Sequence, residues 1–189
     1  RSTPRSSSAA SYVYKRQMCA KSASATGCTS ITSKCSTPGP GVVELRLNGE
    51  DRQVDGDAGR PAIYALRNEL GQKSVRLGCG LEQCGACAVL VDGEARLTCR
   101  MAVGDLAGRV VETVEGLDSP VQRVLAEANA TQCGFCLSGI VIAAEALFRR
   151  KLRPTRAEIV AALDPHLCRC GSHPRVLRSL LALAGRIEE

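Results

Sequence analysis

The stretch from Gly78 to Cys99, GCGLEQCGACAVLVDGEARLTC, constrains the fold more than any other part of the chain. Four residues separate its first two cysteines and two residues separate the next two, which is the spacing of a plant-type 2Fe–2S loop. The glycines in this loop favour the same interpretation, because residues without a Cβ can adopt positive φ and let backbone N–H groups approach the sulfurs. The four cysteines are Cys79, Cys84, Cys87 and Cys99, and the three glycines are Gly78, Gly80 and Gly85.

A zinc site and a pair of disulfides are the two alternatives for these four cysteines. Zinc sites usually present two close pairs of ligands, whereas here three cysteines crowd one glycine-rich loop and the fourth stands apart. Disulfides require an oxidising compartment, and the sequence shows no secretory signal. An iron–sulfur cluster is therefore the preferred interpretation of this first set.

A second set of cysteines lies downstream. Cys133 and Cys136 stand three apart at the start of a helical pattern, so both can point the same way from its first turn, where the helix dipole favours an anionic group. Cys168 and Cys170 are two apart, which predicts an irregular turn that Gly171 relaxes. Taken alone these two pairs could bind zinc, but the neighbouring first set favours a second cluster.

The pattern between residues 42 and 117 predicts a small mixed unit of strands and one helix. Alternating apolar residues flank Asn48-Gly49 and again Asp92-Gly93, and each pair predicts a hairpin. Pro61 opens a short helical pattern that stops at Gly71, and residues 110–114 form a further candidate strand.

From Ser119 the hydrophobic period becomes helical. Helices are expected over residues 120–130, from about Phe135 to Arg150, over 155–163 and over 174–186. Short connections between four helices imply a compact bundle. The sequence thus predicts an α+β protein with a boundary near residues 116–119, and its low aromatic content of 3% suggests that each half relies on a metal or disulfide staple.

Residues 1–41 are rich in Ser and Thr and lack helical or strand periodicity, which predicts a disordered extension. A targeting peptide, a metal-binding arm holding Cys19, Cys28 and Cys35, and a non-native extension are the other possibilities. We expect these three cysteines to bind nothing.

The net charge of +6 arises entirely from this segment, which contains Lys and Arg but no Asp or Glu. The remaining chain is neutral and has no basic stripe with interleaved aromatics, so nucleic acid is not an expected partner. No apolar run of about 18 residues is present, so no membrane span is expected, and we expect a cytoplasmic protein.

The combination of GCGLEQCGAC, QCGFCLSGI and LCRCGSHPRVLRSL resembles the iron–sulfur small subunits of the xanthine oxidase family of molybdenum hydroxylases. The likeness covers residues 42–185, and all eight cysteines fall in the two motifs of the family. Within the family, LRNELG and the ending CRCGSHPRVLR look most like the small subunits of nicotinate dehydrogenase and isoquinoline 1-oxidoreductase. Related aldehyde dehydrogenases share the same motifs.

This resemblance implies a β-grasp 2Fe–2S ferredoxin-like domain over residues 42–117 and an all-α four-helix 2Fe–2S-binding domain over 118–189. It also implies a large partner subunit that carries molybdopterin of the cytosine dinucleotide type. Electrons would pass from molybdenum to the second set of cysteines, then to the first set, and finally to a flavin subunit or a cytochrome. The family uses the residue at Gln132 to hydrogen-bond the pterin, whereas the alternative is a polar residue facing water.

The expected function is therefore electron transfer during hydroxylation of an N-heteroaromatic compound or oxidation of an aldehyde, with no catalytic residue on this chain. A freestanding two-cluster carrier and a zinc-stapled interaction module are the alternatives. Arg169, between two ligands, could raise a cluster potential, pair with a partner carboxylate or be an ordinary surface residue. His166 and His173 are expected to be structural or solvent-facing, and Leu137-Ser138 and Ser172-His173 depart from the usual family residues.

Overall fold

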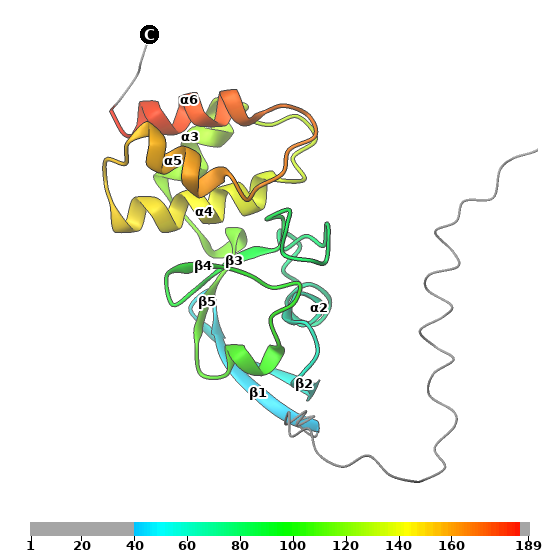
Figure 1. Ribbon diagram of the computed structural model, residues 1–189. Helices are drawn as coiled ribbons and strands as arrows, with labels where there is room; N and C mark the ends of the chain where they lie inside the picture. Colours follow the sequence, from blue (N-terminus) through cyan, green and yellow to red (C-terminus); the bar gives the residue numbers. More distant parts are fainter. Residues whose placement is uncertain (1–39, 186–189) are drawn as a thin grey trace, which may run out of the picture. The chain divides into compact units, whose positions relative to one another are not determined.

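The computed structural model describes residues 40–185, which form a five-stranded mixed sheet followed by four helices (Figure 1). The strand order in the sheet is β2-β1-β5-β3-β4, with β1 and β5 parallel and the other neighbours antiparallel. This α+β arrangement confirms the predicted fold class. The strands are β1 (Pro40–Leu47), β2 (Glu50–Asp57), β3 (Ala88–Val91), β4 (Glu94–Leu97) and β5 (Val110–Glu112).

Both predicted hairpins are confirmed. Asn48 and Gly49 have φ of 51° and 87°, and Asp92 and Gly93 have φ of 51° and 84°. Two consecutive residues with positive φ are the mark of the type I′ turn, whose twist matches that of the flanking strands. These short sequences therefore determine the pairing of β1 with β2 and of β3 with β4.

The parallel pairing of β1 with β5 joins segments more than sixty residues apart, with Arg46 opposite Val110 and Leu47 opposite Val111. The side chain of Asn48 supports it, because its Oδ1 accepts a hydrogen bond from the Thr113 backbone N–H at 2.9 Å and its Nδ2 donates to the Thr113 hydroxyl at 3.0 Å. The turn residue of the first hairpin thus also holds the end of β5.

The strand β1 begins at Pro40, two residues before the predicted start at Val42. Pro40 pairs with Asp57 and Gly41 with Gly56, so β2 also runs longer than its alternating pattern suggested. Proline is tolerated at the first residue of a strand, where its missing N–H costs least. The predictions for residues 1–39, including the roles of Cys19, Cys28 and Cys35, lie outside the described residues.

The helical pattern after Pro61 forms one α-helical turn, α2 (Ala62–Tyr64), followed by a wider π turn over Ala65–Glu69. The Leu70 N–H donates to the Ala65 carbonyl at 3.0 Å, and the segment stops at Gly71, whose φ is 73°. The predicted stop is confirmed, whereas the π geometry was not predicted.

The four predicted helices are confirmed, and two of them begin at side-chain caps. The Ser119 hydroxyl accepts a hydrogen bond from the Gln122 N–H at 3.2 Å, and Thr155 and Glu158 form a capping box. The helices are α3 (Pro120–Glu127), α4 (Leu137–Arg150), α5 (Arg156–Leu163) and α6 (His173–Leu183).

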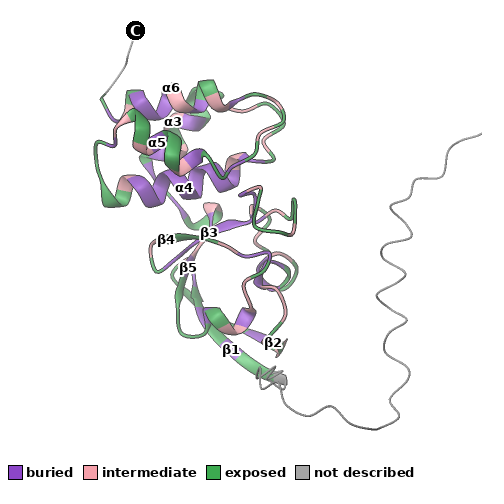
Figure 2. Ribbon diagram, viewed as in Figure 1, coloured by how far each residue is buried: buried purple, intermediate pink, exposed green. Residues whose placement is uncertain are grey.

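Strand β3 is buried on both faces and connects the two hydrophobic cores of the described chain. Val89 and Val91 pack with α2 and the inner face of the sheet, whereas Ala88 and Leu90 pack with the helices. Successive strand residues point to opposite faces, so a four-residue strand can serve both cores. Helix α4 packs against β3, and its residues 138–147 are all buried (Figure 2).

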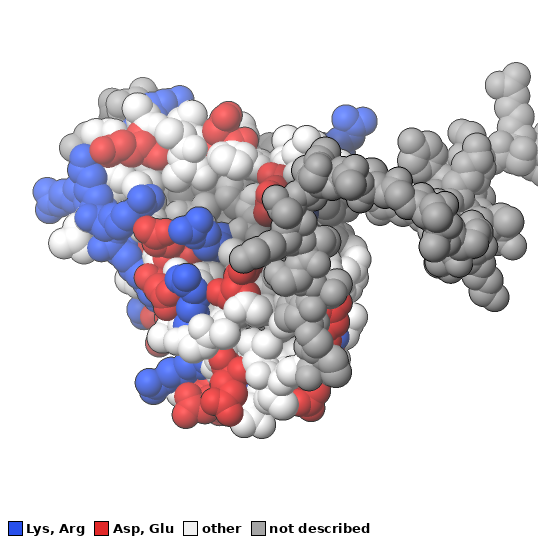
Figure 3. Space-filling model, turned by 60° about the horizontal axis from the view of Figure 1, so that its bottom comes forward, with Lys and Arg blue, Asp and Glu red and all other residues white. Residues whose placement is uncertain are grey.

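Lys and Arg side chains and Asp and Glu side chains are both distributed over the face shown in Figure 3. This mixed surface agrees with the balanced charge of the chain after residue 41. Within residues 40–185, no helix is both long and apolar enough to cross a membrane.

Candidate metal centres

The first set of cysteines lies on the loop between the π turn and β3 and on the turn that follows β4. Cys79 is exposed and Cys84 half-buried, whereas Cys87 and Cys99 are buried. Cys99 stands two residues beyond the end of β4, in the turn that follows the strand. The second hairpin therefore delivers the fourth sulfur to the loop through its outgoing turn.

Backbone N–H groups surround these sulfurs. The N–H groups of Leu81 and Gln83 donate to the Cys79 sulfur at 3.3 and 3.2 Å, and the Glu82 N–H donates to the Cys99 sulfur at 3.3 Å. Glu82 has φ of 59°, a conformation that costs a residue with a side chain roughly 1–3 kcal/mol. This backbone conformation turns the Glu82 N–H toward the Cys99 sulfur. The residue type at position 82 did not indicate this hydrogen bond.

The glycines of the loop meet two different needs. Gly80 and Gly85 have φ of 69° and 72°, as predicted for a loop that turns its N–H groups inward. Gly78 does not have positive φ; instead, a Cβ at this position would lie 2.7 Å from the Cys84 sulfur. Gly78 therefore leaves room for a sulfur.

The thiols of the first set interact in two pairs, Cys79 with Cys84 and Cys87 with Cys99. Hydrogen bonds from the Leu81 N–H and neighbouring groups lower the pKa of Cys79 to about 7. Burial is the largest cause that raises the pKa of Cys99 to about 11, and the adjacent Cys87 thiol contributes to the same shift. One pair is thus near solvent and the other faces the interior.

The second set brings Cys133 and Cys136 together with Cys168 and Cys170. Cys133 lies in the bend before α4 and Cys136 is the N-cap residue of this helix, so both cysteines precede the first helical turn instead of lying within it. Cys168 and Cys170 lie in the turn before α6, where Gly171 has φ of 75°, as predicted.

The thiols of the second set also interact in pairs, Cys133 with Cys170 and Cys136 with Cys168. Burial raises the pKa of Cys136 to about 11. Burial opposes ionisation of Cys168 as well, but hydrogen bonds from the hydroxyl and the N–H of Ser172 outweigh it and lower its pKa to about 7. Ser172, noted in the sequence only as a departure from the family, therefore stabilises a thiolate.

This donor chemistry fits two 2Fe–2S clusters. A 2Fe–2S cluster is held by two protein ligands on each iron, so it requires sulfurs in pairs, which both sets supply. Among residues 40–185, no three His, Cys, Asp or Glu side chains surround the position of a single metal ion, and all eight cysteines are unbridged.

Two further candidate residues lie next to these sets. Gln132 is exposed, and its Nε2 donates to the backbone carbonyl of Cys170 at 2.9 Å. Arg169 is exposed between two cysteines. Gln132 is thus fixed to the turn that carries the second pair of sulfurs.

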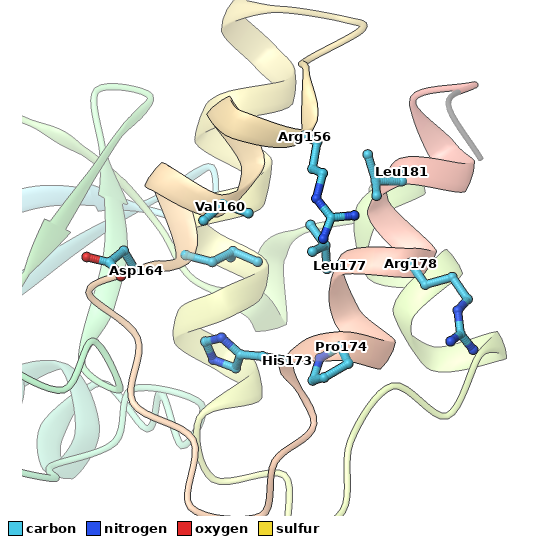
Figure 4. A pocket seen from close by; sticks show the side chains of 9 residues that line it. Arg156, Val160, Asp164, His173, Pro174, Leu177, Arg178 and Leu181 are labelled. Atoms are coloured by element: carbon cyan, nitrogen blue, oxygen red, sulfur yellow. The ribbon is translucent and has the colours of Figure 1, made fainter. Parts of the chain in front are cut away.

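The two histidines differ in burial. His166 is buried, and burial together with the nearby His173 lowers its pKa to about 4. His173 is half-buried at one end of a groove of about 510 Å³ between α5 and α6. Figure 4 shows Arg156 reaching into this groove near Leu177. The groove borders the turn that carries Cys170 but contains no cysteine.

Two families match the chain. The family described as "2Fe-2S iron-sulfur cluster binding domain" matches residues 45–105, and the one described as "[2Fe-2S] binding domain" matches residues 113–181. The fold and the two sets of paired thiols thus define a protein with two 2Fe–2S sites.

Curated relatives narrow this class. The chain is 38% identical over 144 residues to a nicotinate dehydrogenase subunit of Pseudomonas putida, covering 74% of this chain and 92% of the relative. It is 38% identical over 142 residues to the alpha subunit of isoquinoline 1-oxidoreductase from Brevundimonas diminuta, covering 71% and 92%. A solved structure of quinoline 2-oxidoreductase from Pseudomonas putida 86 matches with a TM-score of 0.72 and 26% identity, covering 78% of this chain and 96% of that chain.

The chain belongs to the iron–sulfur small subunits of the xanthine oxidase family of molybdenum hydroxylases. Its role is electron transfer within a molybdenum-dependent oxidoreductase that has a separate large molybdenum subunit. The predicted family and the predicted electron-transfer role are thereby confirmed.

Proposed function

We propose that the eight cysteines ligate the two clusters, with Cys79, Cys84, Cys87 and Cys99 holding one and Cys133, Cys136, Cys168 and Cys170 the other. The observation that carries the proposal is that four separate segments bring these cysteines together as two sets of paired thiols. Each cluster, when bound, accepts and releases one electron. The surrounding N–H groups and Ser172 offset the negative charge of the thiolates.

We also propose that Gln132 contacts a molybdopterin of the cytosine dinucleotide type on the large subunit. Gln132 is exposed beside a small groove of about 230 Å³ that Arg175 and Arg178 also line. An anionic pterin cofactor suits two guanidinium groups, and the bond from Nε2 to the Cys170 carbonyl would connect that cofactor to a ligand of the second cluster.

The first cluster would then pass electrons to a flavin subunit or a cytochrome. Cys79 and Leu81 are exposed, so an electron acceptor can contact this loop.

We propose an N-heteroaromatic substrate, with an aldehyde as the second candidate, because several curated relatives carry the names of such enzymes. Residues 42–117 and 118–189 would act as the two cluster-binding domains, and eight unbridged thiols favour a cytoplasmic location.

Metal analysis and isolation of the complex test this function. The purified chain should contain about four iron and four acid-labile sulfide, since each 2Fe–2S cluster holds two of each. Zinc without sulfide would support the interaction module instead. In the isolated complex, nicotinate or isoquinoline should bleach the cluster absorption, and a chain that purifies without a molybdenum subunit would support a freestanding carrier.

Single substitutions test the ligand assignment. Cys84→Ser should remove the first reduced-cluster signal in electron paramagnetic resonance spectra, and Cys136→Ser the second, each leaving about two iron per chain. The control is Cys28→Ser, which should leave both signals. Two wild-type signals in either ligand variant would refute the assignment.

A further inference from the structure

Ser172 is the N-cap residue of α6, but its hydroxyl does not cap this helix. An N-cap serine normally accepts a hydrogen bond from the backbone N–H of the second or third helical residue. Here the second residue is Pro174, which has no N–H, and the third is Arg175, whose N–H donates to the Ser172 carbonyl at 3.0 Å. The hydroxyl is therefore available for another partner.

The sulfur of Cys168 is that partner. The Ser172 hydroxyl lies 3.2 Å from it, and the Ser172 N–H donates to the same sulfur at 3.4 Å. Ser172 is buried, with 6% of its surface exposed, so water competes little for this bond. A cysteine that ligates a metal has lost its proton, so the hydroxyl must be the donor once Cys168 ligates iron.

The two sets of sulfurs receive hydrogen bonds from different kinds of donor. In the first set, the backbone N–H groups of residues 81–83 donate to Cys79 and Cys99. Among residues 40–185, Ser172 is the only residue other than a cysteine whose side chain bonds to a cysteine sulfur. A substitution can remove a side-chain donor and leave the backbone in place. The second set therefore has a donor that depends on residue type.

The turn before α6 is held by bonds that do not involve the Ser172 hydroxyl. The Leu167 N–H donates to the Cys84 carbonyl at 3.1 Å, and Gln132 Nε2 donates to the Cys170 carbonyl at 2.9 Å. Loss of the hydroxyl should therefore remove one hydrogen bond without moving the sulfurs of the second set.

We propose that the Ser172 hydroxyl, acting through the Cys168 sulfur, raises the reduction potential of the second cluster independently of the first. The proposal rests on the proposed function. An added electron increases the negative charge on the sulfurs, so a hydrogen-bond donor stabilises the reduced state more than the oxidised state. Ser172 thereby makes the second cluster a better acceptor of electrons from the molybdenum subunit.

The electrons balance over one transfer. The group held by Cys168 gains one electron from the molybdenum subunit and loses one electron to the group held by the first set. The hydroxyl proton stays on the Ser172 oxygen throughout, and no covalent bond forms or breaks.

The test is a redox titration of the isolated complex, followed by electron paramagnetic resonance. At a fixed potential, Ser172→Ala should lower the ratio of reduced to oxidised second cluster about tenfold, because a bond to a charged group is lost. For a one-electron couple this change corresponds to a midpoint potential about 59 mV lower. The first cluster, titrated in the same sample, should not shift. Ser172→Thr, which keeps the hydroxyl, should retain both wild-type midpoints.

Ser138→Ala is the matched control. Ser138 also carries a buried hydroxyl next to the second set, two residues after Cys136, but this oxygen has no hydrogen-bond partner among the described residues. Its removal should shift neither midpoint. If Ser172→Ala does not retain the second cluster, Ser172→Thr and Ser172→Val provide the comparison, because the two side chains have nearly the same shape and differ in the hydroxyl.

Three outcomes would overturn the proposal. An unchanged second midpoint in Ser172→Ala, or equal second midpoints in Ser172→Thr and Ser172→Val, would show that the hydroxyl does not act on the cluster. An equal shift of both clusters, or the same shift in Ser138→Ala, would show a general effect on the fold. Loss of the second cluster from every variant without the hydroxyl would show that Ser172 is needed for ligation. The absence of both clusters from the wild-type chain would instead refute the proposed function itself.

Discussion

At the scale of single residues, small side chains decide where the sulfurs can lie. Gly78 leaves space for the Cys84 sulfur, while Gly80 and Gly85 supply backbone conformations that other residues rarely adopt. Two glycines in one loop thus have different physical roles, steric at residue 78 and conformational at residue 80. Substitution by alanine can distinguish the two.

Gly78→Ala should displace the Cys84 sulfur and abolish the first cluster signal, leaving about two iron per chain. Gly80→Ala is the matched control, because no atom lies within 4 Å of its new methyl group and the expected cost is about 1–2 kcal/mol of backbone strain. Iron analysis and electron paramagnetic resonance spectra of both variants provide the measurement. Four iron per chain in Gly78→Ala would contradict the steric role.

At the scale of elements, β3 and α4 join the sheet to the helices. Strand β3 contributes to both cores, and α4 covers its outer face. At the far end of α4, Arg149 donates to both carboxylate oxygens of Glu112 at 2.6 and 3.1 Å and to Glu145 at 2.9 Å. This ion pair extends the contact beyond the apolar surface.

Arg149→Met should destabilise the chain by about 1–3 kcal/mol, because it leaves the buried Glu145 carboxylate without its partner. Arg153→Met is the control, since Arg153 is an exposed arginine in the turn after α4 and the change of charge is the same. Urea unfolding of both variants at low and high salt measures the difference. Equal midpoints would show that the ion pair contributes nothing.

At the scale of the whole molecule, each set of sulfurs joins segments far apart in the chain. Cys99 is tied to the loop of Cys79, and the start of α4 is tied to the turn before α6. When a metal cluster binds cysteines from segments that only folding brings together, the free energy of binding contributes directly to the free energy of folding. We therefore expect bound clusters to stabilise the folded chain in addition to their role in electron transfer.

Removal of iron by a chelator under reducing conditions should lower the unfolding midpoint by roughly 10–20 °C, corresponding to several kcal/mol in a chain of this size. Calorimetry of the loaded chain, the stripped chain and the chain reconstituted with iron and sulfide measures this loss and its recovery. An unchanged midpoint in the stripped chain would contradict the structural role of the clusters.

Local structure was predictable because its causes are local. Asn48-Gly49 and Asp92-Gly93 form the expected turns, Thr155 and Glu158 cap α5, and the spacing of the cysteines indicated their sets. Three features of the structure were not predictable from the sequence. The sequence did not indicate the π turn after α2, the strained Glu82 or the bond from Ser172 to Cys168, because each depends on neighbours that only the folded chain brings close.

The sequence by itself determined the class of fold, the two sets of cysteines and the family, because turn chemistry, helical period and ligand spacing act over a few residues. Only the tertiary structure decided that β1 pairs with β5, that β3 is buried on both faces, and that Leu167 reaches Cys84. These contacts form when distant segments close onto one another, and their geometry follows from the packing of the whole chain. The connection between the two sets is therefore a property of the fold.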